Sequence, residues 1–252
     1  MPDLGFVDKT SFGDVCLDDM GIVVERVHDE IEGVRDNLEE FAGRDGSLYR
    51  TMTISERTIT LECRAFEKDW RGFDTLVDDL MSEFTKSRDE RELHLRTRHG
   101  EHYLAHFSGY SEGDRVGGSG IGGFTLTFTA SDPYRYADDE SSTPILNVNT
   151  PFTVGGTAPV KVVIESSSAR VSTANDQWGV RFDDGDFTHV VMPTSSQSTV
   201  RIDSANRAVT INDESSMITL DSNWMELEPG SHVARVDLGF GSVTLRWRNR
   251  SI

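Results

Sequence analysis

The chain has 252 residues, 43 acidic against 25 basic, and a formal net charge of −18 at pH 7. Such a balance excludes proteins that hold nucleic acid or anionic membranes electrostatically, because phosphates and anionic lipids repel an acidic surface. The length accommodates two domains, or one large β domain, with a proper hydrophobic core.

The basic residues are almost all arginines, since the chain has only four lysines. High acid content with few lysines is typical of a halophile-like surface, and an ordinary acidic protein is the equal alternative. The only two cysteines, Cys16 and Cys63, are too few for a disulfide framework, and Cys63 is expected to be a buried free thiol. No secretion signal and no apolar run of membrane-spanning length is seen, which predicts a soluble protein made in a cytoplasm.

The N-terminal region favours extended structure. Residues 1–20 predict an arm or an edge strand, and residues 21–27 a strand. Apolar spacing in residues 29–41 is helical, but Gly33 and the many acids weaken a helix prediction, and it is the family resemblance set out below that favours a loop here. The glycines of residues 43–46 predict a turn.

Residues 52–64 read as strands, with Ile59, Leu61 and Cys63 on one face. A single amphipathic helix is then predicted at about residues 69–86, capped by Asp69. Its apolar face comprises Phe73, Leu76, Val77, Leu80 and Phe84.

A hairpin is predicted next, from residues 93–97 and 103–110, followed by a glycine-rich loop at 115–123. Residues 124–130 then alternate perfectly between apolar residues and threonines, which predicts a half-buried strand. Pro133 ends that strand because proline has no N–H for the ladder. Residues 138–151 predict a linker.

From residue 152 onward, short alternating strands between turn clusters predict a β-sandwich. The predicted fold is therefore mainly β, with an N-terminal β domain at 1–137, the linker at 138–151 and a β-sandwich at 152–252.

Three sequence segments resemble one family. The strand F-T-L-T-F at 124–128 followed by D-P-Y-R-Y at 132–136 resembles the distal tail proteins of long-tailed, non-contractile phages and related viruses. The loop G-R-D-G at 43–46 and the stretch E-R-E-L at 90–93, with Tyr103 in the hairpin after it, are similar to that family in the same order. The resemblance covers most of residues 10–137 and, more loosely, 152–250. It implies a tail-tube-like first domain and a galectin-like second domain, the latter from residues 224–238.

The glycine run at 118–123 matches G-x-G-x-x-G, but a strand follows it where a dinucleotide site needs a helix, so a flexible loop is expected. The serines at 166–168 lack the G-x-S-x-G pattern of a nucleophile elbow. Aspartates at 183–186 lack the spacing of an EF-hand and predict a hairpin turn.

Four histidines, His94, His99, His102 and His106, invite a zinc interpretation. His102 and His106 cannot chelate together, because four residues of a strand span roughly 13 Å. A site would need His94 from the partner strand, and no cysteine or H-E-x-x-H pattern supports it, so a solvated, arginine-rich face is favoured. We predict no catalytic, cofactor-binding or metal-binding residue, no cofactor and no enzyme activity.

The resemblance implies a structural virion protein at the tail tip. In that family the subunit forms a ring, by implication a homohexamer, that joins the tail tube protein to the hub or fibre protein. One alternative is a glycan-binding adhesion module, for which Trp178 and Trp224 are the candidate aromatics; another is a tail tube subunit. The densest basic group, Arg88, Arg91, Arg96 and Arg98, is interleaved with acids, so no stable nucleic-acid binding and no membrane binding are expected.

Overall fold

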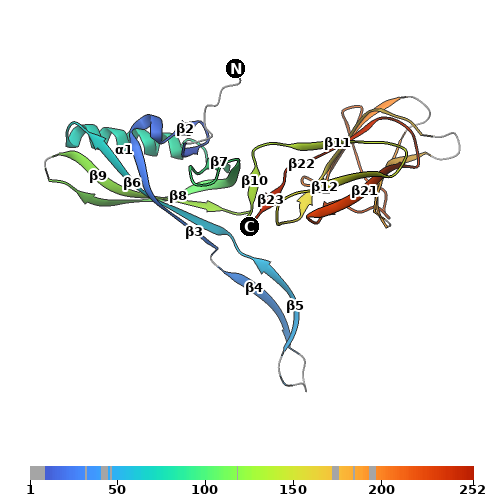
Figure 1. The fold of residues 1–252 in the computed structure, drawn as a ribbon, viewed down its shortest axis with the longest axis horizontal. Helices are drawn as coiled ribbons and strands as arrows, with labels where there is room; N and C mark the ends of the chain where they lie inside the picture. Colours follow the sequence, from blue (N-terminus) through green and yellow to red (C-terminus); the bar gives the residue numbers. More distant parts are fainter. Residues whose placement is uncertain are drawn as a thin grey trace. The chain divides into compact units, whose positions relative to one another are not determined.

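The computed structural model describes residues 9–31, 33–40, 45, 47–117, 119–171, 176–183, 185–192 and 197–252. The chain divides into two compact units, Met1–Tyr136 and Ala137–Ile252, called here the first and the second unit. Both consist mainly of strands, as predicted (Figure 1). No helix among the described residues combines the length and the hydrophobicity needed to cross a membrane.

The first unit is built on one antiparallel sheet with the strand order β2-β1-β7-β8-β9-β6-β3. Its elements are β1 (Ser11–Phe12), β2 (Val15–Cys16), the 3₁₀ helix η1 (Asp18–Met20), β3 (Ile22–Ile31), β4 (Val34–Glu40), β5 (Ser47–Ile54), β6 (Arg57–Glu67), α1 (Trp70–Thr85), β7 (Arg91–His94), β8 (Glu101–Arg115) and β9 (Gly120–Ala130). The next strand, β10 (Arg135–Ala137), pairs with β8.

The alternation predicted for the central strands is confirmed. In β9 every second residue from Gly120 to Ala130 is buried, and the predicted face of β6 is buried as well. β6 and β9 pair over eleven registered positions. The buried faces of these two strands form the sheet side of the hydrophobic core in the first unit.

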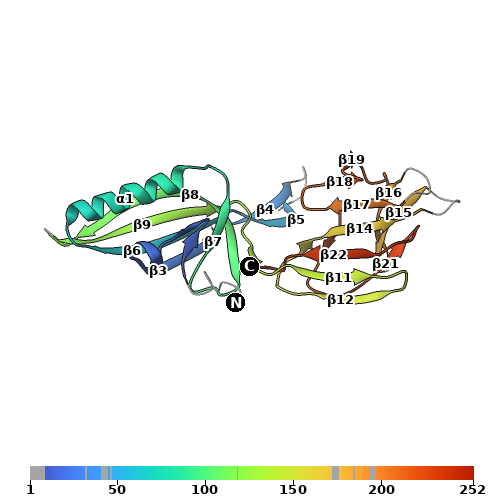
Figure 2. The same ribbon diagram turned by 90° about the horizontal axis from the view of Figure 1, so that it is seen from above.

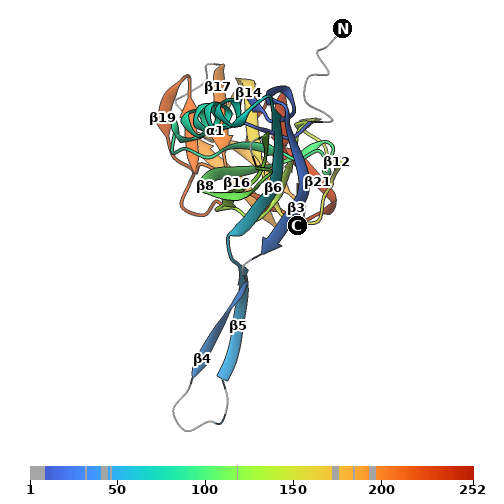
Figure 3. The ribbon, with the colours of Figure 1, turned by 90° about the vertical axis from the view of Figure 1, so that its left-hand side faces the viewer.

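The loop expected at residues 29–41 is wrong. β3 continues to Ile31, and β4 pairs with β5 in a hairpin that extends β3 and β6 beyond the sheet (Figures 1 and 3). Charged residues are so frequent in this stretch that it has no alternating hydrophobic signal. Of the turn expected at 43–46, only Asp45 belongs to the described residues.

The predicted helix is confirmed as α1, which lies along one face of the sheet over β9 and β6 (Figure 2). Asp69 caps it, since its Oδ1 accepts a hydrogen bond of 2.9 Å from the backbone N–H of Gly72. Phe73, Leu80 and Phe84 are buried against the sheet, as expected from their spacing.

The glycine-rich loop predicted at 115–123 is wrong in its bounds, because β8 runs to Arg115 and β9 begins at Gly120. A Cβ atom at Gly122 would lie 2.7 Å from the ring of Phe73 on α1. At Gly120 it would lie 2.3 Å from the carbonyl oxygen of Glu67. Glycine therefore occupies these positions because the helix and its leading turn pass so close to the strand. Gly118 lies outside the described residues.

The second unit is a sandwich of a six-stranded sheet, β11-β22-β14-β17-β18-β19, and a four-stranded sheet, β12-β21-β15-β16, with a separate β13-β20 ladder. Its strands are β11 (Ser141–Ile145), β12 (Thr150–Val154), β13 (Val160–Lys161), β14 (Val163–Ala169), β15 (Gln177–Phe182), β16 (Asp186–Val191), β17 (Ser198–Asp203), β18 (Ala208–Ile211), β19 (Glu214–Ser216), β20 (Glu226–Leu227), β21 (Gly230–Asp237), β22 (Val243–Trp247) and β23 (Arg250–Ser251). Side chains from both sheets form one core that includes Trp178, Val180, Ile202 and Leu245.

Part of the predicted linker at 138–151 is strand. All five residues of β11 pair with β22, and Ile145 is buried in the second core. The serines and Pro144 gave this stretch the composition of a loop. β11 is an edge strand, where a proline without an N–H is tolerated.

Candidate functional site

A buried polar cluster surrounds Tyr103 of β8, whose side chain is 1% exposed. The hydroxyl of Tyr103 donates a hydrogen bond of 2.6 Å to Oδ2 of Asp29 on β3. It also accepts one of 2.9 Å from Nη1 of Arg57, the first residue of β6. Nε of Arg57 lies 3.5 Å from Oδ1 of Asp29, so the three side chains close a ring of contacts where β3 and β6 leave the sheet.

Arg135, from the D-P-Y-R-Y motif, joins this cluster from β10. Its Nε donates a hydrogen bond of 2.7 Å to Oε2 of Glu101, and its Nη1 lies 3.4 Å from the hydroxyl of Tyr103. We call the five side chains of Asp29, Arg57, Glu101, Tyr103 and Arg135 the Tyr103 network. Two guanidinium groups face two carboxylates, so the charges within the network balance. Burial raises the pKa of Tyr103 above its usual value, so the hydroxyl, already protonated at neutral pH, remains a donor to Asp29 at higher pH as well.

The E-R-E-L segment, which also carried the family resemblance, contacts the chain next to the D-P-Y-R-Y motif. Oε1 of Glu90, in E-R-E-L, accepts a hydrogen bond of 3.2 Å from the backbone N–H of Ser131, just before the D-P-Y-R-Y motif. Within that motif, the hydroxyl of Tyr136 donates a 2.5 Å hydrogen bond to Oδ2 of Asp132. The two sequence segments thus hold each other at the end of β9.

Arg91, also in E-R-E-L, ties the helix to the sheet. Its Nη2 donates a hydrogen bond of 2.9 Å to the carbonyl oxygen of Phe84 at the C-terminal end of α1. Its guanidinium lies 4.1 Å from the ring centroid of Phe12 on β1. A cation at this end of the helix also complements the helix dipole.

The side chains of the Tyr103 network have a structural role. Its charged groups bind one another across strands β3, β6, β8 and β10, and none of its members is a nucleophile paired with a base. The described cysteines are equally unsuited to nucleophilic chemistry: both are buried and free, and burial raises the pKa of Cys63 to about 12.

The four histidines of the β7–β8 hairpin do not form one uniform surface. His94 and His102 are cross-strand partners with ring centroids 5.2 Å apart, whereas His106 pairs with Thr129 on β9. The expected solvated face is wrong for His102, which is only 3% exposed. Glu92, which belongs to no motif considered for metal binding, lies beside these two histidines.

Aspartates at the predicted 183–186 turn bind protein groups. Asp183 accepts hydrogen bonds of 2.9 Å from Nδ1 of His232 and 2.9 Å from the backbone N–H of Val233. Asp186 accepts one of 3.1 Å from Asn223. Burial alone would lower the pKa of His232, but its hydrogen bonds to Asp183 and to the Glu228 carbonyl outweigh that effect and raise it. Asp184 lies outside the described residues.

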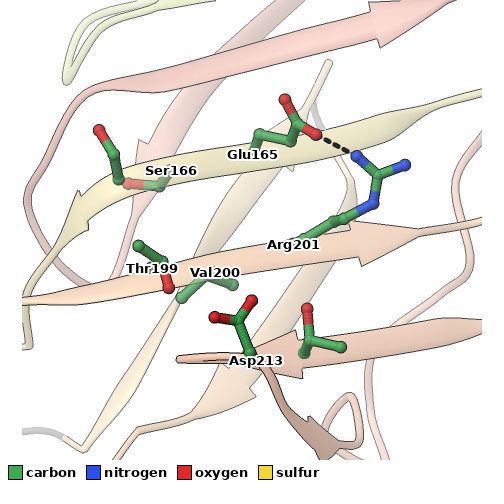
Figure 4. A pocket seen from close by; sticks show the side chains of 8 residues that line it. Glu165, Ser166, Thr199, Val200, Arg201 and Asp213 are labelled. Atoms are coloured by element: carbon green, nitrogen blue, oxygen red, sulfur yellow. Dashed lines mark hydrogen bonds and ion pairs between the residues drawn. The ribbon is translucent and has the colours of Figure 1, made fainter.

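A shallow depression of about 230 Å³ lies on the six-stranded sheet over β14, β17 and β18 (Figure 4). Its lining consists of Glu165, Ser166, Ser167, Thr199, Val200, Arg201, Thr210 and Asp213. Glu165 and Arg201 form an ion pair across it. None of these described lining residues is aromatic, which gives a sugar no ring to stack on.

The two tryptophans considered for sugar binding pack into the protein. Trp178 is fully buried and donates a hydrogen bond of 3.2 Å to the carbonyl oxygen of Phe240, and Trp224 is partly buried against the same core. Ser166 is buried in β14, and the hydroxyls of Ser168 and Ser242 lie 2.9 Å apart.

Two family models match the chain in sequence order. The model described as a phage tail protein RIFT-related domain matches residues 19–130, and the C-terminal domain of the siphovirus-type tail component matches residues 155–250. The chain belongs to the distal tail protein family of siphovirus-type phages. It is thus a structural component of the distal tail and baseplate hub, and it has the mainly β fold that the sequence predicted.

Solved structures agree in fold. The crystal structure of the SPP1 Dit protein (gp 19.1), described as a paradigm of the hub adsorption apparatus in phages that infect Gram-positive bacteria, matches with a TM-score of 0.79 and 16% identity. That match covers 97% of this chain and 99% of the other. A chain of the phage p2 baseplate in its activated conformation with Sr matches with a TM-score of 0.51 and 11% identity, over 93% of each chain. None of the curated proteins matches this sequence.

Proposed function

We propose that this distal tail protein forms a closed ring at the tail tip, which joins the tail tube protein to the hub or fibre protein. The main support is the match of both domain models in one chain, together with a full-length fold likeness to SPP1 Dit. A tail tube subunit, the alternative from sequence, would lack the second sandwich. On this proposal the chain is synthesised in the host cytoplasm, is located in the virion and has no enzymatic role.

A ring needs a heterologous contact whose rotation closes on itself. The strand order of the first unit ends at β3, so the other edge of this ten-residue strand offers backbone donors and acceptors. The β4–β5 hairpin continues from the same edge. We infer that the first unit builds the ring through this edge.

Six copies of the 28.1 kDa chain would have a mass of 168.6 kDa. Light scattering on the purified chain at several salt concentrations tests this, with imaging of assembled tails as the second measurement. A monomer in every solution and in assembled tails would refute the ring. If the acidic surface is an adaptation to a halophilic host, the ring should weaken at low salt, because unscreened carboxylates repel.

A ring that passes a genome must not hold it. The net charge of −18 argues against duplex DNA binding, and Arg91 already binds the end of α1. We therefore propose a neutral or acidic lumen. A gel-shift titration at low salt should show no micromolar binding of duplex DNA; binding that fades with added salt would mean that a basic channel exists.

A further inference from the structure

Three potential metal ligands converge on the outer face of the β7–β8 hairpin. His94 and His102 are register partners on neighbouring antiparallel strands, so their side chains emerge on the same face. Glu92 lies two residues before His94 and shares that face, while Leu93 and Tyr103 between them point into the core. One ligand atom from each of the three side chains lies within 4.8 Å of the other two.

We propose that Glu92, His94 and His102 bind a divalent metal ion of the zinc type. Two imidazoles and one carboxylate form a common ligand set for zinc, with the fourth position left to water. Ligands held about 2.0–2.1 Å from a tetrahedral zinc ion lie roughly 3.4 Å from one another. Nε2 of His94 is already 3.4 Å from Oε2 of Glu92, and Nε2 of His102 is 3.8 Å from Oε1 of the same carboxylate. The two distances run to different oxygens of the carboxylate, and the three ligand atoms lie within 4.8 Å of one another, so side-chain rotation must bring them closer together to form a tetrahedral site.

The surroundings of His102 favour this geometry. Its ring is stacked on that of Tyr136, with centroids 6.1 Å apart and planes at 21°, so the D-P-Y-R-Y motif covers it. A ligand held by packing loses little freedom when an ion binds. Glu92 is 52% exposed at its side chain and His94 22%, which leaves an entry path from solvent.

The ion would cross-link β7 to β8 through side chains, beside the strand end where Arg135 and Tyr136 leave the first unit. Because an ion that binds only the folded state stabilises it by mass action, metal binding should raise the melting temperature. The site therefore adds a structural role that does not depend on ring formation.

The test uses the full chain purified without a polyhistidine tag. Zn²⁺ is titrated in by calorimetry, and the melting temperature is recorded with Zn²⁺ and again after EDTA. We expect one ion per chain and a rise in melting temperature that EDTA reverses. The visible absorption of bound Co²⁺ reports the coordination geometry independently.

Two variants change accessible ligands and leave the buried ring of His102 in place. His94→Ala and Glu92→Gln should each weaken Zn²⁺ binding about tenfold or more, whereas His106→Ala, on β8 like His102, should leave it unchanged. Absence of Zn²⁺ binding by the unaltered chain would overturn the proposal. So would binding that survives His94→Ala, or that falls equally in His106→Ala, because the ion would then sit at other histidines.

Discussion

Removing a single oxygen atom tests whether the Tyr103 network stabilises β8 and β10, the last strands that it joins in the first unit. Tyr103→Phe keeps the aromatic ring in the core but deletes the hydroxyl that donates to Asp29 and accepts from Arg57. Net contributions of hydrogen bonds to charged groups are about 1.5–3 kcal/mol each. Water can replace the lost partner at Asp29, which is 18% exposed, but hardly at Arg57, which is 4% exposed.

We therefore expect a loss of about 2–3 kcal/mol, less than the sum of the bonds that the hydroxyl makes with Asp29, Arg57 and Arg135. Because the chain has two units, a single global unfolding free energy is not well defined, and the loss is better measured locally. Hydrogen exchange of the amides of β8 and β10 should accelerate roughly 30- to 150-fold, since each 1.4 kcal/mol corresponds to a factor of ten.

Tyr110→Phe is the matched control. Tyr110 is a partly buried tyrosine on the same strand, and its hydroxyl makes no hydrogen bond to a described residue. Its loss should change exchange by less than a few-fold, in line with substitutions away from a network. If the amides of β8 and β10 exchanged no faster in Tyr103→Phe than in Tyr110→Phe, the hydroxyl would not contribute to stability. The proposed stabilising role of the network would then be refuted.

Three further changes probe the packing of α1 on its sheet and the ion pair of His232 with Asp183. Leu80→Asp buries an unpaired charge under α1 and should cost more than about 4 kcal/mol, seen as loss of soluble protein, while Thr75→Asp on the exposed face of α1 should fold normally. Gly122→Ala overpacks the helix against β9 and should cost about 1–3 kcal/mol in thermal unfolding, whereas Gly117→Ala, whose Cβ meets nothing within 4 Å, should be neutral. Since the pKa of His232 is raised in the folded state, its stabilising contribution is complete below its unfolded pKa and lost as pH rises through the folded value. The difference in denaturation midpoint between the unaltered chain and His232→Gln should therefore shrink from mildly acidic to alkaline pH; a constant difference would contradict the raised pKa.

Much of the fold could be predicted from sequence where one face of an element is buried. The alternation of residues 124–130 predicted β9, and the apolar spacing after Asp69 predicted α1 together with its cap. Segments with no such pattern were misjudged. β4 is highly charged, and β11 is an edge strand with the composition of a loop.

The candidate site was accessible only in part. Sequence showed the E-R-E-L and D-P-Y-R-Y segments, but Asp29 and Arg57 come from a different region, and nothing local marks an arginine that will be buried. Glu92 was missed because the predicted strand began at residue 93, whereas β7 begins at Arg91; Glu92 and His94 therefore lie two residues apart on one strand and share a face. The glycine run was misjudged because its cause, the ring of Phe73, lies on the helix and not in the neighbouring sequence.

The D-P-Y-R-Y motif shows how a structural protein can have a recognisable sequence signature that is made of side-chain contacts. Asp132 accepts from Tyr136, the N–H of Ser131 before it is held by Glu90, and Arg135 reaches Glu101. The first contact lies within the motif, whereas Glu90 and Glu101 come from more than thirty residues away, so these two contacts form only when the distant partner is present. A single motif is therefore weak evidence for the family. Motifs in the right order are stronger evidence, because E-R-E-L and D-P-Y-R-Y meet at the end of β9 and Arg135 joins β10 to β8.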